Sequence, residues 1–210
     1  MRITYLFDPL CGWCYGAEPA LAKLAQMDRV AIELAPIGLF AGQGARPLDA
    51  QFAAYAWQND QRIARLTGQI FSDAYRTRVL GATGDLFDSA PATLGIIAVG
   101  LAAPDREFVA LKALQHARYV DGLSITDVAA VADILERAGF SEAARRVGDP
   151  DAQLLAAYRS RTEAARAEMA RFGAEGVPAL VVGEGARRRL HPSSALFGDI
   201  GSLKAQLQAA

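Results

Sequence analysis

The stretch Asp8-Pro9-Leu10-Cys11-Gly12-Trp13-Cys14 contains both cysteines of this 210-residue chain. Residues 2–7, just before it, are mostly apolar, β-branched or aromatic, which predicts a short buried strand that ends at Asp8-Pro9. Residues 13–27, just after it, have leucines at helical spacing and predict a helix. The cysteine pair is therefore expected where a strand ends and a helix begins.

This position suits thiol chemistry. A helix N-terminus offers free N–H groups and a positive dipole end, which favour the thiolate form of Cys11. The thiolate is the attacking species in disulfide exchange, and Cys14, one turn further on, is placed to attack a mixed disulfide on Cys11. Gly12 relieves crowding between the two sulfurs, and Trp13 offers an apolar lip for a substrate peptide. The spacing therefore predicts a redox pair.

Two other interpretations of the cysteines remain open. Both could be inert buried residues near a helix start. A zinc site would need His116 and His191 as its further ligands, but these lie far apart in the chain and on different predicted elements. We therefore expect no metal, and we interpret both histidines as structural.

The remaining elements follow from the same patterns. Residues 30–37 alternate as a second strand, so the chain begins β-α-β. From Pro47 to about Phe172 the chain is Ala-rich with helical period, and its Gly and Pro punctuation predicts roughly five or six helices. Strand signals return at 178–182, with 187–190 as a hairpin partner and a closing helix after His191-Pro192. We expect a thioredoxin-like domain formed by 1–46 and 174–210, with 47–173 as an all-helical insertion domain.

The composition excludes several function classes. The chain has 22 Lys and Arg against 23 Asp and Glu, a net charge of −1, so its charge favours neither nucleic acid nor a membrane surface as partner. No window reaches the roughly 18–20 apolar residues of a membrane span. The apolar run before Asp8 is shorter than a signal peptide requires, so we expect a cytoplasmic protein.

A second motif, Gly176-Val177-Pro178, opens the predicted strand at 178–182. Because this strand should lie beside the first strand, Val177 and Pro178 are expected near Cys11. We predict a cis bond before Pro178, although only about 5–6% of X–Pro bonds are cis. Such a bend would leave the backbone groups of Val177 free to pair with an extended substrate peptide.

The cysteine motif, the helical insertion and the Val-Pro pair together resemble the DsbA family of thiol–disulfide oxidoreductases, which are thioredoxin folds with an inserted helical domain. The run from Asp8 to Gly16 is most similar to the cytoplasmic, signal-less branch related to FrnE. The resemblance covers nearly the whole chain and implies that Cys11 is the nucleophile and Cys14 the resolving thiol. It also implies that Val177-Pro178 is the cis-proline loop that holds the substrate.

One position departs from the periplasmic members of that family. They carry a histidine before the second cysteine, which stabilises the thiolate, whereas Trp13 brings no charge. We therefore expect a couple more reducing than the roughly −120 mV of DsbA and nearer the roughly −270 mV of thioredoxin. This favours use as a reductase or isomerase over use as an oxidase.

Other residues have structural interpretations beside functional ones. Asp8 could orient the loop, cap N–H groups or take a proton from Cys14, but an Asp before Pro is also an ordinary turn former. The basic triplet Arg187-Arg188-Arg189 is expected on the solvated face of a hairpin. Aromatic residues of the first inserted helices are expected in the core, with their rim beside a substrate groove over Cys11; they are Phe40, Phe52, Tyr55, Trp57, Phe71 and Tyr75.

Three functions compete. The first is a dithiol oxidoreductase that forms a mixed disulfide on Cys11 with protein or small-molecule disulfides, without a resident cofactor and with glutathione as a candidate co-substrate. The second is a glutathione-dependent enzyme of the kappa-transferase or hydroxychromene-carboxylate isomerase type, which uses one Ser or Cys and needs no resolving thiol. The third is a non-catalytic peptide-binding holdase. The presence of Cys14 favours the first. The sequence gives no oligomeric state.

Overall fold

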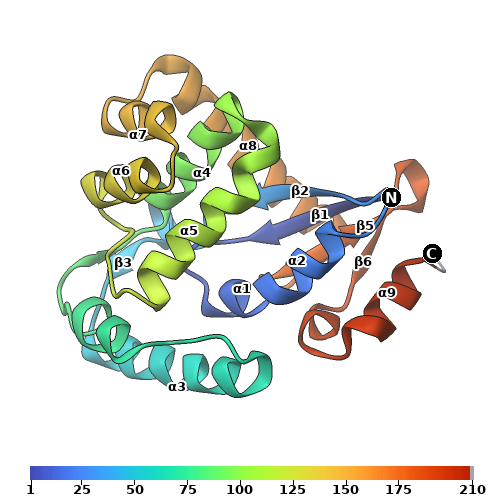
Figure 1. The fold of residues 1–210 in the computed structure, drawn as a ribbon, viewed down its shortest axis with the longest axis horizontal. Coiled ribbons are helices and arrows are strands. Elements are labelled where there is room, and N and C mark those ends of the chain that lie inside the picture. Colours follow the sequence, from blue (N-terminus) through green and yellow to red (C-terminus); the bar gives the residue numbers. More distant parts are fainter. Residues whose placement is uncertain (209–210) are drawn as a thin grey trace.

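The computed structural model describes residues 1–208, and residues 209–210 of the predicted closing segment lie outside the described part. Its centre is a four-stranded mixed sheet in the order β2-β1-β5-β6 (Figure 1). The strands are β1 (Arg2–Phe7), β2 (Ala31–Pro36), β5 (Ala179–Val182) and β6 (Arg189–His191). β1 pairs in parallel with β2 and antiparallel with β5, where Leu6 lies opposite Ala179. The ends of the chain thus form one sheet around the insertion.

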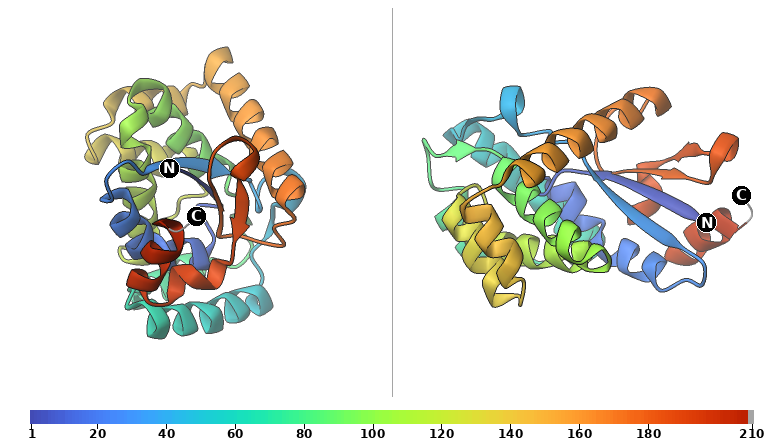
Figure 2. Two further views of the ribbon diagram at one scale, coloured as in Figure 1. Left: turned by 90° about the vertical axis from the view of Figure 1, so that its right-hand side faces the viewer. Right: turned by 90° about the horizontal axis from the view of Figure 1, so that it is seen from above.

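Helices cover both faces of this sheet (Figure 2). On one face Ile3, Tyr5 and Phe7 of β1 share a core with α2 (Glu18–Ala25) and α9 (Ile200–Gln208). On the other face Leu6 packs in a second cluster with residues of α8 (Ala152–Phe172). This division follows from the alternation of side chains along a strand. It makes β1, buried on both faces, the centre of the sheet.

The segment between β2 and β5 is nearly all helical. Its most buried member is α4, whose apolar residues face in every direction, as expected for a helix surrounded by others. A two-residue ladder between β3 and β4 is an unpredicted exception to the all-helical insertion. The elements are β3 (Arg46–Pro47), α3 (Ala50–Thr67), the π-helical turn Tyr75–Val79, β4 (Leu86–Phe87), α4 (Ala90–Ala102), α5 (Glu107–Tyr119), α6 (Val128–Arg137), α7 (Ser141–Gly148) and α8.

Two predicted elements differ from the structure. The single helix expected over 13–27 is two helices, α1 (Gly12–Gly16) and α2, separated at Ala17. Pro19 in the first turn of α2 explains the break, because proline has no N–H and its ring clashes with the carbonyl four residues earlier. The hairpin partner expected over 187–190 is β6, which begins two residues later, at Arg189. The reason is that Gly185–Arg187 forms a 3₁₀ turn before the strand.

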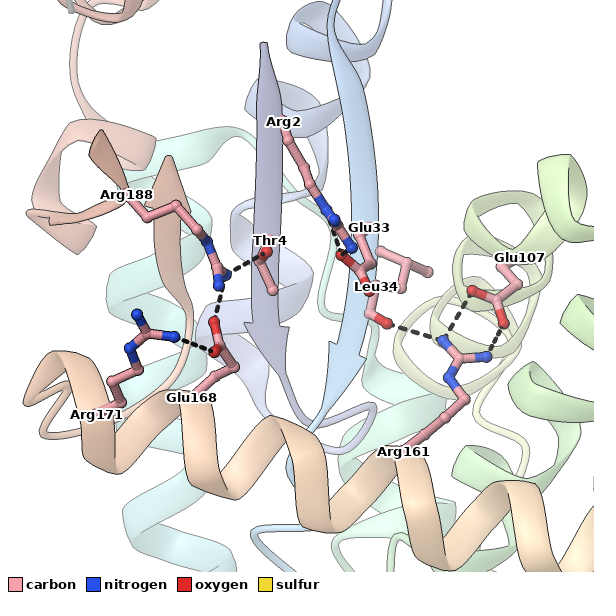
Figure 3. A network of polar contacts seen from close by, with 9 residues as sticks. All are labelled: Arg2, Thr4, Glu33, Leu34, Glu107, Arg161, Glu168, Arg171 and Arg188. Atoms are coloured by element: carbon pink, nitrogen blue, oxygen red, sulfur yellow. Dashed lines mark hydrogen bonds and ion pairs between the residues drawn. The ribbon is translucent and has the colours of Figure 1, made fainter. Parts of the chain in front are cut away.

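The long helix α8 joins the insertion to the sheet through polar contacts (Figure 3). Arg161 pairs with Glu107 of α5 and donates to the Leu34 carbonyl of β2 at 2.8 Å. Arg161 lies in the middle of α8; nearer the C-terminal end of the helix, Glu168 pairs with Arg188, whose guanidinium also donates to the Thr4 hydroxyl. Arg188 therefore faces inward, unlike the exposed Arg187 and Arg189, which corrects the expectation of a fully solvated triplet. The predicted domain boundary at 173 stays a prediction, since α8 contacts both parts.

Replacing Arg161 with alanine is expected to lower the free energy of unfolding by about 1–3 kcal/mol, because it leaves the half-buried Glu107 and the Leu34 carbonyl without this donor. Urea unfolding followed by circular dichroism measures it. Arg171→Ala is the matched control on the same helix, since its contact with Glu168 is long, at 3.8 Å, and exposed; it should cost at most about 0.5 kcal/mol. Equal losses in the two variants would contradict the anchoring role of Arg161.

Within residues 1–208, none of the helices combines the length and the hydrophobicity that crossing a bilayer requires.

Candidate active site

β1 leads through a short loop into α1 (Figure 1), and Cys11 is the last residue before α1. It is the N-cap residue of α1, with extended backbone, and its carbonyl accepts the N–H groups of Cys14 and Tyr15. The predicted position at the start of a helix is found. However, α1 has only five residues, so its dipole is weaker than that of the long helix expected from the sequence.

The two cysteines are free thiols and differ in exposure. Cys11 is 8% exposed and Cys14 is 1% exposed. Burial raises the pKa of the Cys14 thiol well above its ordinary value, and a hydrogen bond with Cys11 raises it further. A protonated, buried thiol is a poor attacking group. Cys11 is therefore the more accessible of the two sulfurs, and its predicted role as the nucleophile stays a prediction.

Val177 and Pro178 lie beside Cys11, although 166 positions separate Cys11 from Val177 in the sequence. The Cys11 thiol donates to the Val177 carbonyl oxygen at 3.7 Å, and the peptide bond between Val177 and Pro178 is cis. The antiparallel pairing of β1 with β5 explains this approach, because the end of β1 lies opposite the start of β5. The Val177 carbonyl, expected to be free for a substrate, is engaged by the thiol.

Asp8 is fully buried in the loop before Cys11. Its carboxylate accepts the N–H groups of Leu10 and Phe40 and the hydroxyl of Ser89, the last at 2.7 Å. Burial raises the pKa of this carboxyl, and the three donors oppose that shift. These contacts support two of the roles considered for Asp8, orienting the loop and binding N–H groups. Proton transfer from Cys14 stays a hypothesis.

The rim of the site is aromatic. Trp13 is half-buried and packs edge-on against Phe197, with ring centroids 5.1 Å apart. The guanidinium of Arg62 lies 5.7 Å from the centroid of the Trp13 ring, so a cation lies near a position that the sequence showed as uncharged. Of the aromatic side chains predicted to be mostly core, Phe71 and Tyr75 are buried and Tyr55 is exposed.

The two histidines do not form a metal site with the cysteines. His116 is exposed and lies 3.3 Å from Asp121. His191 is buried in β6, and neither of its ring nitrogens has a hydrogen-bond partner. Within residues 1–208, no group of three or more His, Cys, Asp or Glu side chains is arranged to hold a metal ion.

Sequence reasoning missed a second group of residues around the cysteines. The Tyr5 hydroxyl donates to the Cys14 carbonyl, and the Tyr119 hydroxyl donates to the Leu10 carbonyl at 2.8 Å. Asp60 of α3 lies against Gly12. The one available sequence signal is that Asp60 lies three residues before Ile63, on the face of the 50–67 segment that carries its apolar residues.

Gly12 and Gly16 allow α3 to approach α1 closely. A Cβ atom at Gly12 would lie 2.3 Å from Asp60 Oδ1, and one at Gly16 would lie 2.4 Å from Ile63 Cγ2. Gly12 therefore makes room for α3, a role additional to the predicted relief of crowding between the sulfurs.

Replacing Gly12 with alanine is expected to lower the free energy of unfolding by about 1–3 kcal/mol, because the added methyl group forces Asp60 or α3 to move. Gly148→Ala is the control, since a Cβ there meets no atom within 4 Å, and it should change stability by less than about 1 kcal/mol. Chemical denaturation measures both. A neutral Gly12→Ala would show that α3 does not limit this position.

The family model of the DSBA-like thioredoxin domain matches residues 2–200 of the chain. The chain belongs to this family. The predicted DsbA-family membership and the α/β thioredoxin fold with a large helical insertion are therefore confirmed. No curated protein sequence matches the chain.

Solved structures give the same assignment for this DSBA-like chain. The cytosolic disulfide reductase DsbM from Pseudomonas aeruginosa is 30% identical over 100% of both chains, with a TM-score of 0.87. In its structure with GSH, DsbM superposes with a TM-score of 0.81 over 100% of this chain and 98% of that one, again at 30% identity. A protein disulfide isomerase candidate from Nitrosomonas europaea is 26% identical, with a TM-score of 0.78 over 99% and 98% of the chains.

A more distant structure shows the fold alone. A 2-hydroxychromene-2-carboxylate isomerase is 20% identical over 100% of this chain and 95% of that chain, with a TM-score of 0.65. The second predicted function class therefore shares the fold.

Proposed function

We propose that this DSBA-like protein is a thiol–disulfide oxidoreductase that works as a disulfide reductase through a mixed disulfide on Cys11. The observation that carries this proposal is the position of the Cys11 sulfur, at the start of α1 and 3.7 Å from the Val177 carbonyl, with the Cys14 thiol buried behind it. The likeness to the disulfide reductase DsbM along the whole chain supports it.

The reaction proceeds in two exchanges. The Cys11 thiolate attacks one sulfur of a substrate disulfide, forms a Cys11–substrate disulfide and releases the other substrate sulfur as a thiolate. Cys14 then loses its proton and attacks the Cys11 sulfur, which forms the Cys11–Cys14 disulfide and releases the second substrate thiolate. The substrate gains two electrons and the protein loses two. Two thiols of the glutathione class then reduce the Cys11–Cys14 disulfide in two further exchanges and leave joined as one disulfide.

The residues around the sulfurs have separate tasks in this scheme. The substrate rests on the Val177-Pro178 loop, whose Val177 carbonyl contacts the Cys11 thiol, and on the half-buried Trp13. Gly12 lets α3 close over the motif. Burial raises the pKa of the Cys14 thiol, which favours its protonated form in the reduced protein.

Both small and protein disulfides are proposed as substrates, in the cytoplasm. The DsbM structure with GSH supports a small thiol as partner. The uncharged Trp13 supports a couple more reducing than the roughly −120 mV of DsbA, which favours reduction over oxidation. The likeness to the isomerase candidate leaves isomerisation of protein disulfides as a second use of the same exchange.

Two measurements test this function. The first is reduction of insulin and of a glutathione mixed disulfide, with glutathione as electron donor, by wild type and Cys14→Ser. A dithiol reductase loses insulin reduction in Cys14→Ser. A glutathione transferase or isomerase that uses one thiol keeps the turnover of its own glutathione-dependent substrate in this variant. The second is the redox equilibrium with glutathione, and a potential near −120 mV would overturn the reductase assignment.

A holdase would behave differently from both enzymes. It would suppress aggregation of an unfolded client equally well with both cysteines replaced by serine, and it would have no insulin-reducing activity in any variant.

A further inference from the structure

A buried carboxyl from the helical insertion lies against the cysteine motif. Asp60 of α3 is 4% exposed, and its Oδ1 atom faces Gly12 so closely that a Cβ there would come within 2.3 Å. Gly12 directly follows the reactive Cys11. A side chain that carries charge is thus packed within a few ångströms of the backbone between the two cysteines, and the exchange scheme above assigns it no role.

A network of hydrogen bonds and cation–ring contacts surrounds this carboxyl. The Tyr75 hydroxyl donates to Asp60 Oδ2 at 2.9 Å. The guanidinium of Arg118, which is 1% exposed, lies 5.4 Å from the Tyr75 ring centroid and 5.6 Å from that of Tyr119. Tyr119 in turn donates to the Leu10 carbonyl. The network therefore contacts the residues on both sides of Cys11, through Gly12 and Leu10.

The charge of this network changes near neutral pH. Burial raises the pKa of Asp60 to about 7, against the opposing effects of the Tyr75 hydrogen bond and the Arg118 charge. The groups that act on the carboxyl are Tyr75 from the π-helical turn and Arg118 from α5. The hydroxyl of Tyr119, also on α5, is acted on by the charges of both Asp60 and Cys11. With Asp60 protonated, Arg118 leaves a net positive charge beside the motif; with Asp60 ionised, the pair is neutral.

We propose that Asp60 is a positioning residue that keeps the Cys11–Cys14 couple reducing, because its ionised carboxylate beside Gly12 disfavours a thiolate on Cys11. A disulfide carries no charge, so only the reduced protein feels this repulsion. Ionised Asp60 therefore shifts the exchange of reduced protein with glutathione disulfide toward protein disulfide and two glutathione thiols. This inference rests on the proposed exchange at Cys11, and it adds that a residue of the helical insertion shifts the equilibrium of this exchange.

Asp60→Asn tests it, since the amide keeps the shape and an acceptor for Tyr75 but carries no charge. At pH 8 the equilibrium constant for protein disulfide formation with glutathione should fall about tenfold, the equivalent of one pH unit. The difference should shrink below pH 6, where the wild-type carboxyl is protonated. In a Cys14→Ser background at pH 8, iodoacetamide should alkylate Cys11 faster in Asp60→Asn than in the protein that keeps Asp60, and the two rates should converge below pH 6.

Two further variants separate charge from packing. Tyr75→Phe removes the donor that favours the ionised carboxyl, so it should change both readouts in the same direction by a smaller factor, and it serves if Asp60→Asn does not fold. Glu163→Gln, an exposed site on α8, removes one negative charge elsewhere and should change neither readout.

The outcomes distinguish this inference from the function it rests on. A wild type that exchanges with glutathione disulfide, with an unchanged equilibrium constant and alkylation profile in Asp60→Asn, overturns the inference alone. A change as large in Glu163→Gln also overturns it, because net charge would then explain the result. A wild type without any exchange at Cys11 overturns the proposed function itself.

Discussion

Replacing Cys11 with serine is expected to bring disulfide reduction to the uncatalysed level, a loss of roughly 10³-fold or more, as when other enzymes lose their nucleophile. A serine hydroxyl is not ionised near neutral pH and does not attack disulfides. Cys14 cannot substitute for it, because Cys14 is 1% exposed and its burial raises the pKa of its thiol. The initial rate of insulin reduction measures the loss.

Cys14→Ser is the matched comparison for that variant. It keeps the first exchange, because Cys11 and its contact with the Val177 carbonyl are unchanged, but it cannot release a captured substrate within the molecule. Attack by Cys11 should therefore persist while turnover on protein disulfides falls. If Cys11→Ser retained activity that Cys14→Ser lost, the assignment of the outer and inner thiol would be reversed.

Replacing Asp60 with asparagine is expected to stabilise the reduced protein at pH 8 and to leave its stability nearly unchanged at pH 4. Burial raises the folded-state pKa of Asp60 from 3.8 to about 7, so the folded protein binds this proton more tightly than the unfolded chain. The contribution of Asp60 to stability is therefore fully present below about pH 4 and is lost as the pH rises through about 7. The folded-state and unfolded-state pKa values of Asp60 differ by about three units, so this loss lowers the free energy of unfolding of the wild type by about 4 kcal/mol.

Urea unfolding at several pH values between 4 and 8 measures this effect as the difference between Asp60→Asn and wild type. The asparagine side chain resembles the protonated acid at every pH, so the two stability curves should meet at low pH and separate as the pH rises. Glu163→Gln should give a curve parallel to that of wild type. Parallel curves for Asp60→Asn would show that Asp60 does not titrate between pH 4 and 8.

The local motif allowed much of the fold to be predicted. Short-range patterns mark three segments: the apolar run at 2–7, the cysteine pair after it and the strand after Pro178. The pairing of the first strand with the strand after Pro178 was expected from the topology. From these patterns we predicted that Cys11 lies near Val177 and that the bond before Pro178 is cis, and the structure contains both features. The helical period also revealed the insertion.

The differences have physical causes that lie outside such patterns. Pro19 divides a segment whose leucines keep helical spacing throughout, so periodicity alone missed the break at Ala17. Arg188 turns inward because Glu168 of a distant helix offers it a partner. The sequence did not place Asp60 and Arg118 near the cysteine motif. Their neighbours Gly12, Tyr75 and Tyr119 are distant from one another in the sequence and come together only in the folded chain.

The capture of a substrate sulfur by Cys11 is tested most directly with Cys14→Ser incubated with glutathione disulfide and examined by intact-protein and peptide mass spectrometry. We predict one glutathione per chain, attached to Cys11, that wild type releases as it forms the Cys11–Cys14 disulfide. A Cys14→Ser protein that stays folded and acquires no adduct on Cys11, while wild type forms no internal disulfide, would contradict the account.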